Sequence, residues 1–179
     1  MNNPTHELIE AQVGKLLLEK NLKLAVAESC TGGLIGHRIT NIAGSSEYYL
    51  GSITAYAYEV KQRLLGVKAE TLAQHGAVSR ETVIEMAQGI RNCLSADFPV
   101  SNTIGLSVSG IAGPGGGIPG KPVGLVWIGL STPDGDHAWK LLWKGDRIQN
   151  KENSAEAALE FLLGYLTANL PPDTPYKEI

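Results

Sequence analysis

A hydroxyl and a thiol stand side by side in the segment from Ala27 to Gly33, which reads AESCTGG. Ser29 follows a short apolar run and precedes a helical pattern, so we expect it at a strand-to-helix turn. Backbone N–H groups at such a turn, here near Thr31, Gly32 and Gly33, can hold an oxyanion or a phosphate. The alternative is that a Ser or Thr hydroxyl of this segment only caps the following helix, and that the glycines allow this helix to pack closely against the sheet. The motif alone leaves both interpretations open.

A second loop, from Ser109 to Gly117 (SGIAGPGGG), is unusually rich in glycine. So many glycines after a strand cost conformational entropy unless the backbone approaches a ligand or adopts positive φ. The loop, which includes Gly110 and Gly113, is therefore a candidate ligand cradle, and a mobile surface loop is the alternative.

Two nucleotide and metal patterns are incomplete. Gly115 to Lys121 matches the first seven positions of a P-loop, but Pro122 replaces the Ser or Thr that holds magnesium, and a strand pattern follows. This excludes a nucleotide triphosphatase. The histidines show no metal-ligand spacing, so no metal site is expected; they are His6, His37, His75 and His137.

Single residues elsewhere could also bind or react. Asp146 is a helix cap by type and position, which would leave the Arg147 guanidinium free to bind a planar anion such as phosphate. Cys30 is an alternative nucleophile to Ser29, although a small thiol in this place can equally serve packing. Cys93 is the second of two cysteines in the sequence, and the two do not form a CxxC pair. We therefore expect both to be reduced thiols.

The elements that must position these residues alternate between helix and strand. The first helix is predicted to be capped by Thr5 and to carry an apolar stripe of Ile9, Val13, Leu16 and Leu17. The elements predicted after it are a strand at Leu22–Ala27, a helix through Ile42, a strand at Tyr49–Ala57, a helix at Glu59–Leu65 ended by Gly66, and a helix capped by Ser79. The last are a strand at Thr103–Ser109, strands at Val123–Leu130 and His137–Trp143 joined by a turn at Thr132–Asp136, and a helix from Arg147.

This order predicts an α/β fold, a three-layer α/β/α sandwich around a mixed, mainly parallel sheet. Three polar or glycine-rich turns follow strands, at Glu28–Gly33, Tyr56–Lys61 and Ser109–Gly117. Ligands in such sheets bind beyond the carboxyl ends of the strands, so these turns are expected to share one cleft. The domain should span residues 5–168, with a flexible tail at 169–179 that has three prolines.

Composition limits the class of protein. The chain has 179 residues, 43% hydrophobic and 18% charged, which suits one globular domain. The net charge of -3 and the lack of a basic cluster argue against nucleic-acid binding. Neither a secretion signal nor an apolar run of bilayer length is visible, so we expect a cytoplasmic protein without membrane contact.

Several ordered motifs resemble one known family, the CinA C-terminal domain, whose enzymes are nicotinamide-nucleotide amidases. The likeness extends from about Glu7 to Leu166, and its motifs are AESCTGG at 27–33, AGSSEYYLG at 43–51, AYAYEVKQRLLGV at 55–67, GAVS at 76–79, SVSGIAGPGGG at 107–117, KPVG at 121–124 and GDR at 145–147. The sequence departs from the family pattern at Tyr58, where Asn is usual, at Ala43, where Pro is usual, and at Lys151, where a second Arg is frequent.

The resemblance implies a metal-free, cofactor-free hydrolysis in which Ser29 attacks, Lys61 takes its proton and Tyr56 assists. The substrate would be nicotinamide mononucleotide, deamidated to nicotinate mononucleotide, with its phosphate on Arg147 or on the loop from Ser109 to Gly113. The resemblance also implies the stand-alone form, without the family's N-terminal domain. Independently of the resemblance, an exposed apolar helix face could form a symmetric homodimer. The alternatives are a non-catalytic nucleotide-binding module and an amidase for another small carboxamide.

A lysine base needs a lowered pKa, because the unperturbed value is about 10.4. We expect burial among Val60, Leu64 and Leu65, together with the positive end of the helix, to lower the pKa of Lys61. Glu59 would oppose this if it faced inward. From spacing alone, Lys61 could equally be a solvated helix residue.

Overall fold

The computed structural model describes residues 7–95 and 97–174. Its five-stranded sheet has the order β2-β1-β3-β4-β5, with β1 at Lys23–Glu28, β2 at Tyr49–Thr54, β3 at Thr103–Gly110, β4 at Leu125–Thr132 and β5 at Gly135–Leu142. β1 pairs in parallel with β2 and β3, whereas β4 is antiparallel to both neighbours. Four of the five strands therefore run in one direction.

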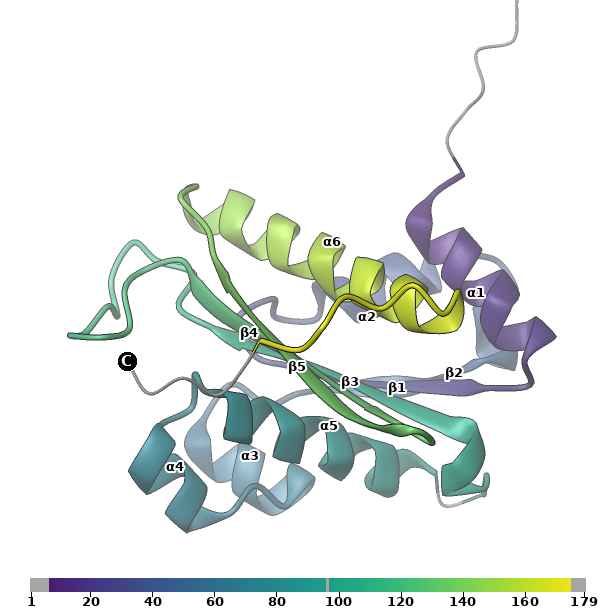
Figure 1. Cartoon of the computed structure of the whole chain (residues 1–179), viewed down its shortest axis with the longest axis horizontal. Coiled ribbons are helices and arrows are strands. Elements are labelled where there is room, and N and C mark those ends of the chain that lie inside the picture. Colours follow the sequence, from purple (N-terminus) through teal and green to yellow (C-terminus); the bar gives the residue numbers. More distant parts are fainter. Residues whose placement is uncertain (1–6, 96, 175–179) are drawn as a thin grey trace, which may run out of the picture.

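Helices cover both faces of the sheet (Figure 1). On one face lie α1 (Ile9–Glu19), α2 (Leu34–Thr40) and α6 (Arg147–Leu166), and on the other lie α3 (Tyr58–Leu65), α4 (Ala69–His75) and α5 (Arg80–Leu94). Each face has its own buried apolar cluster, one including Leu24 and Leu159 and the other Met86 and Ile90. The predicted three-layer α/β/α sandwich with a mixed sheet is confirmed.

Local signals explain where several helices begin and end. The Ser79 side chain accepts from the Thr82 N–H, and Asp146 forms a capping box with Gln149, so both predicted caps are confirmed. Gly66 ends α3 with a left-handed φ of 66°, a conformation that costs glycine little. Thr5, the predicted cap of the first helix, lies outside the described residues, and α1 begins at Ile9.

The structure differs from the sequence-based prediction in two places. α4 was not predicted, because its seven residues show little apolar periodicity. The hairpin between β4 and β5 is tighter than expected, since Thr132 already pairs with Gly135.

Part of the segment predicted to be a flexible tail makes contacts with the domain. The Thr174 N–H donates to the Ala138 carbonyl at 3.1 Å, and Asp173 contacts Arg80 and His137. Residues 175–179 of that segment lie outside the described residues.

Gly89 tests the packing of α5 against α3. A Cβ at this position would lie 1.8 Å from the Leu65 carbonyl oxygen. Gly to Ala inside a helix usually stabilises by about 1 kcal/mol, but here the clash with backbone should instead destabilise by about 1–3 kcal/mol. Chemical denaturation of Gly89→Ala measures this. Gly115→Ala is the control, since nothing lies within 4 Å of a Cβ there; a stabilised Gly89→Ala would contradict the packing.

Candidate active site

The turns after three strands meet where the strand order changes direction. β2 lies on one side of β1 and β3 on the other, so the crevice beyond the carboxyl ends of β1 and β3 is a switch point, the usual ligand position in such sheets. A cavity of about 400 Å³ opens there, and Ser29, Lys61 and Gly110 all line it. The structure thus brings the three predicted turns together.

Ser29 is held at the end of β1 with only 8% of its surface exposed. Its N–H donates to the Val108 carbonyl of β3 at 3.0 Å, which continues the sheet pairing by one residue. The strand ends there and α2 begins at Leu34. The Ser29 hydroxyl therefore lies at the base of the cavity, at the predicted strand-to-helix turn.

The fully buried Glu28 carboxylate fixes this turn. It accepts from the Thr31 hydroxyl at 2.6 Å and from three backbone N–H groups, those of Gly33, Ile35 and Gly36, at 2.9–3.1 Å. A carboxylate at a helix N-terminus satisfies N–H groups that would otherwise lack partners. The sequence analysis missed this role, although an acidic residue just before a predicted helix start was the available signal.

Two of the predicted oxyanion donors are consequently occupied. The Gly33 N–H donates to the Glu28 carboxylate, and the Gly32 N–H donates to the Ser29 carbonyl at 3.2 Å. In residues 7–95 and 97–174, the N–H groups of Cys30 and Thr31 donate to no oxygen acceptor, although both stabilise the adjacent Cys30 sulfur and oppose the rise in its pKa. Of the predicted segment, Thr31 alone therefore retains a free backbone donor.

Lys61 extends from α3 toward Ser29, and only 1% of its surface is exposed. Its Nζ lies 3.0 Å from Ser29 Oγ, 2.6 Å from the Ala55 carbonyl oxygen and 3.3 Å from that of Tyr56. Burial lowers the pKa of Lys61 to about 8, against a small opposing effect of Cys30. Leu64, expected to help bury it, is itself exposed.

The two carbonyl contacts orient the amine. A neutral amine has two N–H groups and one lone pair. When protonated, Lys61 Nζ donates to Ser29 Oγ at 3.0 Å. In the neutral amine, with both N–H groups on the carbonyls of Ala55 and Tyr56, the lone pair would face the Ser29 hydroxyl. This is the geometry that a serine nucleophile and a neighbouring general base require.

Cys30 is unsuited to be the nucleophile. Burial raises the pKa of its thiol to about 12, so at neutral pH it is almost entirely protonated. Its sulfur would also lie 3.1 Å from a Cβ at Gly110, which places it in the packing between β3 and the Ser29 turn.

Tyr56 and Arg147 form a pair at the rim of the cavity. The Tyr56 hydroxyl accepts from the Arg147 guanidinium at 3.2 Å, and Arg147 also donates to the Gly113 carbonyl at 2.7 Å. The Tyr56 phenol therefore contacts Arg147 rather than the Ser29 hydroxyl, and its contact with Lys61 is through its backbone carbonyl.

The glycine-rich loop forms the opposite wall. The Ser109 hydroxyl donates to the Ala77 carbonyl at 2.7 Å, which ties the end of β3 to the segment before α5. Gly110 allows close packing, because a Cβ there would lie 2.5 Å from Val126. Gly113 positions Arg147 through its carbonyl and has a left-handed φ of 91°.

The charges around this cavity have one sign. Lys61, Lys121 and Arg147 line it, and no Asp or Glu does so among the described residues. Lys121 was not predicted to belong to the site, because 60 residues separate it from Lys61 in the sequence and only the fold brings both to one cavity. An anionic ligand would be favoured here.

A protein-family model described as the CinA C-terminal domain matches residues 6–166. The chain belongs to the CinA family. A Halothermothrix orenii relative, named as competence-damage inducible, is 51% identical over 156 residues, 87% of this chain and 36% of that protein. A CinA-like protein of Salinibacter ruber is 47% identical over 85% of this chain and 35% of its own length. The chain thus spans about a third of these CinA relatives.

A solved CinA superfamily structure from Klebsiella pneumoniae has the same fold. It matches with a TM-score of 0.82 and 31% identity over 89% of this chain and 96% of its own. The resemblance inferred from the motifs is therefore confirmed at the level of the CinA family and its fold.

Tyr58, a departure from the CinA pattern, lines the cavity and is half exposed. Its hydroxyl accepts from the Ala77 N–H at 3.4 Å. Tyr58 and Ser109 therefore both bind Ala77, and Tyr58 forms one side of the cavity there. This position makes it able to affect which substrates fit.

The remaining polar groups do not form a comparable site. In the described ranges, no cluster of three or more His, Cys, Asp or Glu side chains could hold a metal ion. His75 pairs with Glu81 and His137 with Asp173, whereas His6 lies outside those ranges.

Within the same ranges, no helix has the length and hydropathy needed to cross a bilayer.

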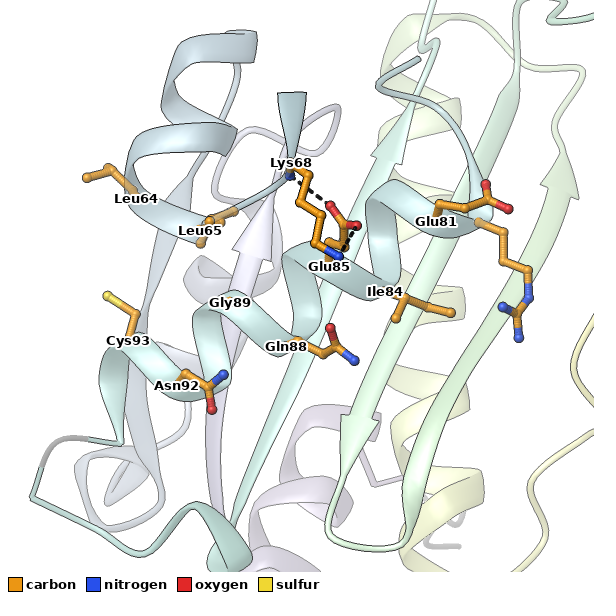
Figure 2. A pocket seen from close by; sticks show the side chains of 12 residues that line it. Leu64, Leu65, Lys68, Glu81, Ile84, Glu85, Gln88, Gly89, Asn92 and Cys93 are labelled. Carbon is orange, nitrogen blue, oxygen red and sulfur yellow. Dashed lines mark hydrogen bonds and ion pairs between the residues drawn. The ribbon is translucent and has the colours of Figure 1, made fainter. Parts of the chain in front are cut away.

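A larger groove of about 700 Å³ lies along α5 in this CinA domain (Figure 2). Lys68 is connected there to Glu85 both through its backbone N–H, at 2.9 Å, and through its ammonium, at 3.8 Å. Cys93 and Leu64 are at one end. The groove lacks a nucleophile with an adjacent base, so size alone does not make it the candidate site.

The buried Lys61 predicts a specific pH dependence of stability. Because its pKa is about 8 in the fold and 10.5 otherwise, the unfolded chain binds more protons between these values and stability rises with pH. Replacing Lys61 with Met removes this dependence, so the stability of the wild type relative to Lys61→Met should improve by about 2–3 kcal/mol from pH 7 to pH 10.

Denaturation of both proteins at each pH checks this prediction. Lys144→Met, which removes an exposed lysine, is the matched control and should follow the wild type. A constant difference between wild type and Lys61→Met would mean that Lys61 titrates normally.

Proposed function

We propose that this chain hydrolyses the carboxamide of nicotinamide mononucleotide, giving nicotinate mononucleotide and ammonia. The observation that supports this most is the buried Lys61 amine, 3.0 Å from Ser29 Oγ and with a pKa lowered to about 8. A serine hydroxyl becomes an effective nucleophile when a neutral base is next to it.

The reaction divides into two transfers. Ser29 Oγ attacks the carboxamide carbon while its proton passes to Lys61 Nζ, and the tetrahedral intermediate collapses when Lys61 returns the proton to the leaving nitrogen. The C–N bond breaks, ammonia departs and an ester with Ser29 remains. Water then attacks the ester carbon while Lys61 accepts its proton, and the bond between that carbon and Ser29 Oγ breaks as Lys61 returns the proton to Oγ. The product acid leaves and releases its remaining proton to solvent.

The oxyanion of each tetrahedral intermediate needs donors. The N–H groups of Cys30 and Thr31 adjoin Ser29 and donate to no oxygen among the described residues, so they are the available pair. Backbone donors that are fixed before the reaction stabilise developing charge without reorganising. Glu28 fixes them by holding the start of α2 in place.

The lining of the cavity fits a phosphorylated aromatic amide. Arg147 and Lys121 supply positive charge without a competing carboxylate among the described lining residues. Tyr56, Tyr58 and Ile118 are exposed at the rim, where an aromatic ring can stack or pack. A pyridine carboxamide with a phosphate at its far end matches both features.

Ammonia release from purified protein tests the proposal. The Ser29→Ala variant should lose several orders of magnitude in kcat, as other nucleophile deletions do, whereas Cys30→Ala should retain most activity. Nicotinamide mononucleotide and nicotinamide are compared as substrates, with release measured in a coupled assay.

Three results would contradict the proposal. Near-normal turnover by Ser29→Ala would exclude Ser29 as the nucleophile. Equal or faster turnover of nicotinamide would point to an amidase for other small carboxamides. Binding of the mononucleotide without any ammonia would point to a non-catalytic nucleotide-binding module.

A further inference from the structure

Lys121 is carried by a tight turn beside the cavity that Arg147 also lines. Ile118 and Lys121 exchange both backbone hydrogen bonds, at 3.0 and 2.9 Å, around Pro119 and Gly120. Gly120 has a φ of 78°, which suits the third position of a turn with proline second. The turn therefore gives Lys121 a defined starting position.

The Lys121 side chain crosses the rim of the cavity. Its Nζ donates to the His75 carbonyl on α4, and it passes so close to Gly76 that a Cβ there would lie 3.0 Å from it. This contact connects the glycine-rich loop to the segment between α4 and α5. The ammonium thus lies at the cavity surface rather than in open solvent.

Lys121 has no ion-pair partner among the described residues. Partial burial lowers the pKa of its ammonium, and the carboxylate of Glu81, which contacts His75, opposes this shift. One of its three N–H groups is used by the His75 carbonyl, so two remain for a ligand. A partly buried cation without a counterion favours binding of an anion.

The other two cations of the cavity are already engaged. Lys61 contacts Ser29 and two carbonyls, and Arg147 donates to Gly113 and to Tyr56. Arg147 retains further N–H groups, but its orientation is set by these neighbours. The Lys121 ammonium, by contrast, makes a single hydrogen bond to the described residues, the one to the His75 carbonyl.

We propose that Lys121 binds the phosphate of the substrate, a phosphomonoester, in the cavity that Ser29 and Lys61 also line. This inference rests on the proposed function for the substrate, since the same chemistry would bind free phosphate. Arg147 faces the same space and would supply a second contact. Lys121 would thereby decide between phosphorylated and unphosphorylated amides.

Kinetics with matched substrates test this assignment. Lys121→Gln keeps a donor for the His75 carbonyl and removes the charge. We expect its KM for nicotinamide mononucleotide to rise about 10- to 100-fold, as for loss of a charge-assisted hydrogen bond, with kcat little changed. Its KM for nicotinamide riboside, which lacks the phosphate, should stay within about twofold. Lys144→Gln, on an exposed residue, is the control for net charge.

Calorimetry separates this inference from the proposed function. In the Ser29→Ala background, Lys121→Gln should weaken binding of nicotinate mononucleotide more than binding of nicotinate riboside, whether or not the wild type releases ammonia. Competition by inorganic phosphate shows whether the site takes the anion alone. If turnover fails but this difference in binding persists, the proposed function is wrong and the phosphate site stands.

Equal losses for phosphorylated and unphosphorylated ligands would overturn the assignment, because they indicate a structural role for Lys121. Unchanged KM and binding in Lys121→Gln would overturn it as well. If Lys121→Gln does not fold, as circular dichroism would show, Lys121→Met is measured in the same way.

Discussion

The structure depends on a lysine amine that is withdrawn from water without a carboxylate to neutralise it. Burial of a charged ammonium is unfavourable, and the fold offers Lys61 two carbonyl oxygens and a hydroxyl instead of an ion pair. The equilibrium between protonated and neutral Lys61 is therefore shifted toward the neutral amine, compared with a lysine in water. The parallel pairing of β1 and β2 makes this possible, because α3 follows β2 directly and begins next to the end of β1.

Glu28 shows how the fold keeps a nearby carboxylate away from that amine. It is one residue before Ser29, and an ion pair with Lys61 would favour the charged ammonium. Its oxygens are instead surrounded by the Thr31 hydroxyl and the first N–H groups of α2. The same contacts shape the Ser29 turn, so one buried side chain both stabilises a helix start and leaves the cavity without negative charge.

Much of the framework was predictable, because it follows from local pattern. The caps Ser79 and Asp146, the end of α3 at Gly66 and the convergence of three strand-end turns follow from residue type and spacing. The missed features depend on contacts between distant segments. Lys121 reaches His75 across the cavity, and Asp173 holds the chain along β5. No local pattern shows which N–H groups Glu28 occupies.

The central claim is that a neutral Lys61 activates Ser29, and the pH dependence of kcat/KM for ammonia release tests it most directly. The account predicts that kcat/KM rises with pH through an apparent pKa near 8, since protonated Lys61 cannot accept a proton. Lys61→Ala should abolish this rise together with most activity, and Lys61→Arg should not restore it, because a guanidinium stays charged. Full activity of Lys61→Ala with the same rise would contradict the account and assign the base to another group.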